Sequence, residues 1–328
     1  MSCYDKIILD EISSPITEEL QLFEREYHHQ LSSDTDFLQP LLDYIRNSRG
    51  KRLRPILFFL SQGLMSRPNA ESVKIAVLLE LLHTATLIHD DVVDGSSERR
   101  GRKTMNAVWG NHISVLVGDY LLSKVLALGV KSGWEGILEV VSKVVMDMGK
   151  GELRQTLEGI GKRLTVDEYF LIIREKTAGL FMAACELAGL VMTASPGEKN
   201  RLHRLGETFG MAFQIRDDIL DFSGYSERMG KPVGQDVSNG RATLPFIMAL
   251  EGATEEETRR VLQRFERGTD DDGDWIREFV KKRGGIEKAQ EKVRHFIDQA
   301  EKILASFEPS IYRESLERLM AHNLESLG

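Results

Sequence analysis

Proline is absent from residues 69–195 of this 328-residue chain, although Pro68 and Pro196 bound that interval. Proline interrupts helix interiors, so this stretch can form long unbroken helices. Its apolar residues recur mainly at spacings of three and four, which is the period of one helical face. We find no convincing two-residue alternation and no hairpin dipeptide between two such runs. The chain is therefore predicted to be all-α.

Helix starts are also marked by side chains. Ser195-Pro196-Gly197-Glu198 combines a capping box with proline at the first helical position, and Thr165–Glu168 and Thr254–Glu257 are further capping boxes. With the apolar periodicity, these signals predict helices near 15–31, 35–48, 54–66, 70–94, 105–131, 134–159, 166–194, 197–223, 241–252, 255–267, 273–283, 285–306 and 310–325. No linker rich in Pro, Gly or Ser separates them. Residues 1–328 are therefore predicted to form a single helical domain.

Composition limits the possible partners and the cellular location. The net charge of −8 argues against a nucleic-acid binder, which carries an overall basic balance. The two cysteines, Cys3 and Cys185, have neither metal-ligand spacing nor a disulfide pattern, so a reducing cytoplasm is expected. Apolar windows such as IAVLLELLHTATLI are interrupted by Glu80 and His83 and are too short to cross a bilayer. We expect no membrane span.

Two similar acidic motifs end apolar helices, LIHDDVVDG at 87–95 and QIRDDILDFSG at 214–224. Positions i and i+4 share a helical face, so the outer aspartates of each motif repel one another. A glycine follows each motif and suggests a helix C-terminus, where backbone carbonyls already carry partial negative charge. An acidic helix end in solvent is the simpler interpretation of one motif, but two copies within apolar helices favour bound cations. The six acids are Asp90, Asp91, Asp94, Asp217, Asp218 and Asp221.

Carboxylate oxygens without nearby His or Cys suit hard ions, and Mg²⁺ prefers to share its coordination with substrate phosphates and water. Basic residues follow the first motif at once, at Arg99 and Arg100, and an arginine fork matches the oxygens of a metal-bound diphosphate. RGKRLRP at 49–55 places four cations just before an apolar helix, as in an anion site at a helix entrance. Taken singly, Lys176 and Lys231 are more simply interpreted as surface charges.

Together these segments resemble the trans-polyprenyl diphosphate synthases. RGKRLRP, HTATLIHDDVVDGSSERRG, GDYLL, KTAGLF, FQIRDDILD, GKPVGQD and ATLPFIMAL occur in that family's order and approximate spacing, from about 45 to about 255. The resemblance implies an isoprenoid-synthase fold, a large helical bundle with a central cavity, assembled as a homodimer. It also implies a Mg²⁺-dependent prenyltransferase, with Mn²⁺ as a substitute. Isopentenyl diphosphate is joined head-to-tail to an allylic diphosphate, leaving a new trans double bond.

The resemblance also implies roles for individual residues. Asp90, Asp94 and Asp217 would be the principal metal ligands, supported by Asp91, Asp218 and Asp221. The allylic diphosphate would contact Arg99, Lys176, Thr177, Gln214 and Lys231. Isopentenyl diphosphate would be held by Lys51, Arg54, His83 and Arg100. A lone histidine on an apolar helix is usually a core residue, and at His83 only the motif match reverses that expectation.

The chain departs from the family at two places that bear on the site. Arg241 stands where the family usually has a lysine before the TLP segment, so the role of that lysine in diphosphate binding is in question. The final residues, HNLESLG, lack the basic residues often found there in relatives. Residues 255–328 have helical periodicity but suggest no function.

Product length is predicted from the helix that leads to Asp90. Thr86 and Ala85, four and five residues earlier, are small, and Leu82 lies one turn deeper. Family members that stop at short products resemble one another in having bulky aromatic residues there, so this chain is expected to make a product of 30 to 50 carbons for quinone side chains. Ala85 could instead serve only helix packing. Farnesyl or geranylgeranyl diphosphate synthase is the nearest alternative, followed by a terpene cyclase or a non-catalytic synthase subunit.

Overall fold

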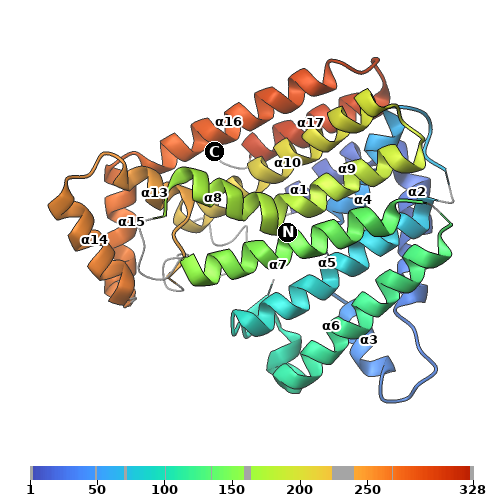
Figure 1. Cartoon of the computed structure of the whole chain (residues 1–328), viewed down its shortest axis with the longest axis horizontal. Helices are drawn as coiled ribbons and strands as arrows, with labels where there is room; N and C mark the ends of the chain where they lie inside the picture. The colour runs from blue at the N-terminus through green and yellow to red at the C-terminus, as the bar shows by residue number, and fades with distance from the viewer. Residues whose placement is uncertain are drawn as a thin grey trace.

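Helices form nearly all the secondary structure in a computed structural model of the chain, which confirms the all-α prediction (Figure 1). The structure describes residues 3–48, 50–69, 72–99, 101–133, 135–158, 164–223, 240–267 and 269–325. Its elements in the N-terminal half are α1 (Cys3–Ile12), the 3₁₀ helix η1 (Ser14–Ile16), α2 (Thr17–Gln30), α3 (Gln39–Arg46), α4 (Leu53–Gly63), α5 (Val73–Val93), the strands β1 (Glu98–Arg99) and β2 (Arg102–Lys103), α6 (Met105–Lys131) and α7 (Ile137–Glu158).

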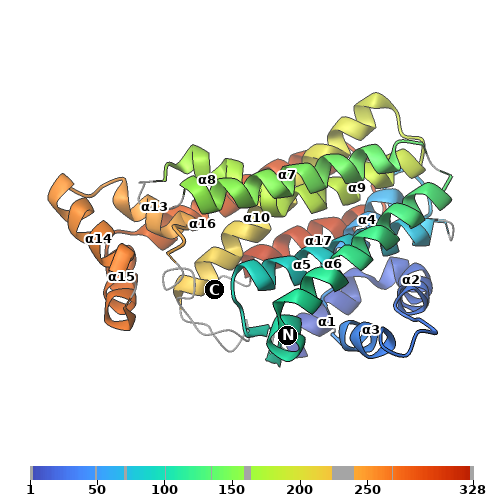
Figure 2. The same ribbon diagram turned by 60° about the horizontal axis from the view of Figure 1, so that its bottom comes forward.

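Among the described residues of the C-terminal half, helices are the only regular secondary structure. Its elements are α8 (Val166–Ile173), the π-helical turn η3 (Arg174–Ala178), α9 (Gly179–Val191), α10 (Pro196–Ser223), α13 (Leu244–Leu250), α14 (Glu255–Arg267), α15 (Asp270–Lys282), α16 (Gly285–Leu304) and α17 (Ile311–Glu325). The long helices α5 and α10 run in the same direction, so their C-terminal ends lie at one end of the bundle (Figures 1 and 2). Helix α5 packs on α6, whereas α10 packs on α9 and α16.

The predicted capping boxes form. Thr165 Oγ1 accepts from the Glu168 backbone N–H at 3.3 Å, and the Glu168 carboxylate accepts from the Thr165 N–H at 2.8 Å. Equivalent pairs begin the helices that follow Ser195 and Thr254. Each box satisfies backbone donors that the first helical turn leaves without partners.

Three local features differ from the predictions. Helix α1 was not predicted, although its Leu9 and Ile12 are buried in the main core. The expected helix over 166–194 is divided by the π-helical turn at 174–178. The turn was not predicted because a change of hydrogen-bond register leaves the apolar spacing of the sequence almost unaltered. A ribbon of two-residue strands pairs Glu98 with Lys103, and strands this short cannot show alternation.

Two groups of buried residues stabilise the fold. The main core extends from α1 to α17, and a smaller core around Phe246, Phe265 and Val280 lies beneath α13, α14 and α15. Ala242 and Ile286 pack against both cores. The helices α14 and α15 lie at one end of the molecule, at the left of Figure 1.

Helix α6 is unusual in leaving much of its apolar surface uncovered. In the described part of the chain it is the one helix long and apolar enough to cross a membrane by length and composition, and only 33% of its most apolar window is buried. Core helices of soluble proteins meet the same criterion. The exposed residues include Leu116, Leu126 and Val130.

Candidate active site

The two acidic motifs lie at neighbouring helix ends. Asp90, Asp91 and Asp94 occupy the last turn of α5 and its C-cap, and Asp217, Asp218 and Asp221 occupy the last turns of α10. Both ends face the same side of the bundle (Figures 1 and 2). Asp91, Asp218 and Asp221 are buried, whereas Asp90, Asp94 and Asp217 are half-buried. The repelling carboxylates are therefore partly removed from water.

The π-helical turn η3 joins the two motifs. Thr177 Oγ1 donates to Gln214 Oε1 at 2.8 Å, and Gln214 Nε2 donates to Asp218 Oδ1 at 2.7 Å. The other Asp218 oxygen accepts from the Tyr169 hydroxyl at 2.6 Å. A Cβ at Gly210 would lie 2.6 Å from Ala178 Cα, so only glycine lets α10 approach the turn this closely.

Lys176 lies on the same turn and is held by helix α7. Its Nζ donates to Gln155 Oε1 at 2.7 Å and lies 2.5 Å from Glu152 Oε2. Helix α7 comes this close because a Cβ on Gly151 would lie 2.9 Å from the backbone nitrogen of Lys176. Glu152 and Gln155 were not predicted from the sequence. Their spacing of three residues on a helix is compatible with a shared ligand but is too common to indicate one.

The environment of Asp90 opposes its charged form. Burial, together with the neighbouring carboxylates of Glu152 and Asp94, raises the pKa of the Asp90 carboxyl to about 6, while Lys176 acts in the opposite direction. The influence of Lys176 shows that the turn bonded to the second motif also lies beside the first. The turn therefore lies near both motifs.

Two arginines bind carboxylates of the first motif. Arg99 Nε lies 2.8 Å from Asp91 Oδ1, and both side chains are mostly buried. Arg241, just before α13, forms an ion pair with Asp94. This ion pair joins the residues just before α13 to the first motif. Arg241 therefore reaches the acidic site even though it replaces the family's usual lysine.

Asp217 is held differently, through a buried arginine. Arg216 Nη2 lies 3.1 Å from Asp217 Oδ1, and Arg216 Nη1 donates to Asn323 Oδ1 of α17 at 2.8 Å. The first distance does not correspond to an aligned hydrogen bond, and within the described residues Asp217 Oδ1 is buried without a hydrogen-bond partner. Arg216 and Asn323 were also missed from sequence, because nothing near Asn323 indicates contact with a helix about a hundred residues earlier.

The acidic groups fit a divalent cation in their chemistry but do not form a complete cage. Among the described residues, no three His, Cys, Asp or Glu side chains converge as metal ligands. Asp91, Asp94 and Asp218 are instead turned toward Arg99, Arg241 and the Tyr169–Gln214 pair. An incomplete set matches Mg²⁺, which takes few carboxylates and completes its coordination with phosphate and water. Asp217 Oδ1 is buried without an aligned hydrogen bond, although Arg216 Nη2 lies 3.1 Å away, and is a further candidate ligand atom.

The predicted cations lie on several elements. Lys51 precedes α4, and Arg54 on α4 places its Cζ 4.5 Å above the Phe181 ring of α9. His83 is half-buried on α5, two turns before Asp90. Arg100 and Lys231 lie outside the described residues.

The predicted product-length residues are located on the buried side of α5. Leu82 and Ala85 have no exposed surface, and Thr86 is half-buried. Leu121 and Val125 of the adjacent helix α6 are buried as well. An open cavity of about 680 Å³ lies elsewhere, between α1 and α2, and contains none of the predicted site residues.

Known proteins share both this sequence pattern and this fold. Residues 35–282 match the family model described as polyprenyl synthetase. Octaprenyl diphosphate synthase of Escherichia coli is 35% identical, over 88% of this chain and 89% of that protein. The solved decaprenyl diphosphate synthase of Rhodobacter capsulatus superposes with a TM-score of 0.90 at 33% identity, covering 98% of this chain and 99% of that one. A polyprenyl synthase from Caulobacter crescentus, complexed with calcium and isoprenyl diphosphate, gives a TM-score of 0.90 at 32% identity over 96% and 97%.

The hydrogen bond from Tyr169 to Asp218 can be tested directly. A charge-assisted hydrogen bond contributes about 1.5–3 kcal/mol, so Tyr169→Phe is expected to lower kcat of prenyl transfer by about tenfold to a hundredfold. Urea unfolding should show that the variant remains folded under the assay conditions, so that the lower kcat does not result from unfolding. The matched control is Tyr312→Phe on α17, whose ring packs over Gly63 of α4 rather than at the acidic site. Unchanged kcat in Tyr169→Phe would remove this bond from the catalytic machinery.

Proposed function

Because the chain belongs to the polyprenyl synthetase family, we propose that it joins isopentenyl diphosphate to an allylic diphosphate at the site between α5 and α10. The chain is a transferase of the polyprenyl diphosphate synthase type. Its relatives make octaprenyl and decaprenyl diphosphates, which favours a long all-trans product over a short one. This agrees with the prediction of 30 to 50 carbons.

The observation that supports the site most directly is the bridge at η3. One turn carries Lys176, which acts electrostatically on Asp90, and Thr177, which is joined through Gln214 to the second motif. A diphosphate between the helix ends would meet a cation and a hydroxyl on this turn, with Arg99 on the ribbon close by. These groups can orient the leaving group and balance the charge that develops on it.

A divalent metal is the partner that the acidic groups require. The calcium and isoprenyl diphosphate in the Caulobacter relative support such a cation, and we propose Mg²⁺ because it favours shared coordination with diphosphate. The ligands would come from Asp90, Asp94 and Asp217, supported by Asp91, Asp218 and Asp221. When bound, the metal serves as a Lewis acid that stabilises the departing diphosphate.

The second substrate would bind beside the first. We assign isopentenyl diphosphate to Lys51, Arg54, His83 and Arg100, and the allylic diphosphate also to Lys231. The allylic tail would then extend along α5, past Thr86 and Ala85 toward Leu82. The bundle would act as one domain, in a reducing cytoplasm.

Loss of either acidic motif should stop the reaction. The assay combines purified protein, Mg²⁺, labelled isopentenyl diphosphate and farnesyl diphosphate. Asp90→Ala and Asp217→Ala are each expected to lower turnover by at least about 10²–10³-fold, because each removes charge that holds the leaving group. EDTA should abolish wild-type turnover, and Mg²⁺ or Mn²⁺ should restore it. Asp274→Ala, with a side chain 74% exposed on α15, is the control; near-normal rates in the motif variants would contradict the assignment.

Product length should respond to the residue four before Asp90. Thr86→Phe places an aromatic ring where the tail is expected to pass, at a position that is only half-buried. We expect shorter products, about 20 carbons or fewer, by chromatography, since a closed channel excludes further methylenes. Ile311→Phe, 57% exposed on α17, should leave the product unchanged. A long product from Thr86→Phe would place the channel elsewhere.

We also propose that two copies associate through α6 and α7, because these helices carry most of the exposed large apolar residues in the described part of the chain. These residues include Leu126 and Val130 on α6 and Leu157 on α7. The double variant Leu126→Lys with Val130→Lys is expected to sediment as a monomer, and wild type as a dimer. Phe37→Lys, at a residue 79% exposed outside this surface, should remain dimeric. Dimeric behaviour of the double variant would exclude this face.

A further inference from the structure

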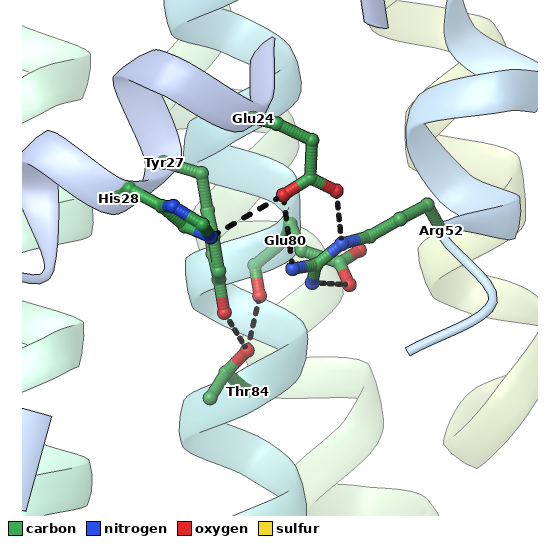
Figure 3. Close-up of polar contacts among 6 residues, drawn as sticks. All are labelled: Glu24, Tyr27, His28, Arg52, Glu80 and Thr84. Carbon is green, nitrogen blue, oxygen red and sulfur yellow. Dashed lines mark hydrogen bonds and ion pairs between the residues drawn. The ribbon is translucent and has the colours of Figure 1, made fainter. Parts of the chain in front are cut away.

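Arg52 belongs to the same basic segment as Lys51 and Arg54, but its side chain contacts different helices from that of Arg54. It enters the protein between α2 and α5, as Figure 3 shows. Arg54, two residues later, lies instead over the Phe181 ring of α9. At the start of α4, Arg52 therefore contacts α2 and α5, whereas Arg54 contacts α9.

Two carboxylates from different helices hold the Arg52 guanidinium. Its Nε donates to Glu24 Oε1 of α2 at 2.8 Å, and its Nη1 donates to Glu80 Oε1 of α5 at 2.8 Å (Figure 3). A further bond of 3.4 Å reaches the second Glu24 oxygen. The guanidinium thus uses its planar fork to join α2, α4 and α5, which a single-point cation such as lysine cannot do.

The environment of this ion pair is largely dry. The Arg52 side chain is 14% exposed and that of Glu80 is 6% exposed, and Arg52 Cζ lies 4.4 Å from the centre of the Tyr27 ring. Burial alone lowers the pKa of the guanidinium, but Glu80 and Tyr27 raise it to a net value above the ordinary one. Arg52 is fully charged here, and removing it would leave a buried carboxylate without its cation.

The backbone at Arg52 also needs support. Its φ is +53°, and of the non-glycine residues that the structure describes only Thr193 also has a positive φ. A residue with a Cβ adopts this left-handed conformation at a cost in energy, which surrounding contacts must offset. The Arg52 carbonyl then accepts the first backbone bond of α4, from Ile56 N–H at 3.0 Å. The anchored side chain therefore fixes where α4 begins.

Helix α5 links the Arg52 ion pairs to the proposed isopentenyl diphosphate site. Thr84 Oγ1 donates to the Glu80 carbonyl at 2.7 Å and accepts from the Tyr27 hydroxyl at 3.0 Å. Glu80 and Thr84 flank His83, one of the residues assigned to isopentenyl diphosphate. The same helical turn thus holds Arg52 and presents a substrate-binding side chain.

We propose that Arg52 is a positioning residue for the isopentenyl diphosphate site, acting through its neighbours rather than by touching substrate. Its ion pairs with Glu24 and Glu80 hold the left-handed turn before α4. That turn sets where Lys51 and Arg54 stand relative to α5. The inference rests on the proposed function, because it takes these two cations as ligands of the diphosphate.

The test compares KM for the two substrates. Arg52→Lys keeps the charge but loses the fork, and Arg52→Gly relieves the left-handed strain but loses the anchor. Both are expected to raise KM for isopentenyl diphosphate by about tenfold to a hundredfold, since small misplacements of binding groups have effects of this size. KM for farnesyl diphosphate should stay within about twofold, because none of the residues assigned to it lies at the start of α4. Glu80→Gln should raise KM for isopentenyl diphosphate more than Glu24→Gln, whose side chain is 41% exposed in wild type.

Two controls separate the possible outcomes. Arg67→Met breaks an exposed pair with Glu18, 2.9 Å apart, between α2 and the segment after α4, and should change neither KM. Lys51→Met tests the underlying assignment: an unchanged KM for isopentenyl diphosphate there contradicts the proposed site itself. If Lys51→Met raises that KM while Arg52→Lys and Arg52→Gly do not, only the positioning role is wrong. Equal rises for both substrates in the Arg52 variants would also overturn it. If circular dichroism shows that the Arg52 variants do not fold, the milder Glu24→Gln variant replaces them. The same comparison of KM for the two substrates then tests the positioning role.

Discussion

Repulsion between two acidic helix ends is the constraint on which the rest of the site depends. Six carboxylates are gathered at the C-terminal ends of α5 and α10, where the helix dipoles already place negative charge. The chain's own groups balance part of this charge. Lys176 acts on Asp90, Arg99 and Arg241 pair with the first motif, and Tyr169 and Gln214 donate to Asp218.

The π-helical turn makes this arrangement geometrically possible. One extra residue in a helical turn changes which side chains share a face, so Lys176 and Thr177 can contact different helices. Glycines at positions 151 and 210 allow α7 and α10 to approach the turn from either side. A regular helix over 166–194 would direct these two side chains differently. The local irregularity is therefore part of the site.

Much of the fold and the acidic motifs could be predicted from sequence, because periodicity, capping boxes and residue spacing are local properties. The capping boxes at Thr165, Ser195 and Thr254 illustrate this. What could not be predicted depends on distant pairs, such as Arg216 with Asn323 or Lys176 with Gln155, and on hydrogen-bond register, as at 174–178. No local pattern records which of several arginines is turned inward.

Arg52 and Arg216 are largely buried arginines that bind other residues of the protein. The sequence alone does not distinguish them from arginines that bind substrate. Arg52 lies among residues assigned to isopentenyl diphosphate, and Arg216 directly precedes Asp217 of the second motif, yet both are directed toward protein partners. A buried ion pair contributes little net stability, since desolvation offsets the attraction, but it tolerates few alternative geometries. Such pairs are therefore better suited to fixing positions than to strengthening the fold. Diphosphate recognition needs positions fixed in this way, because its charge-assisted hydrogen bonds weaken steeply once donors move out of line.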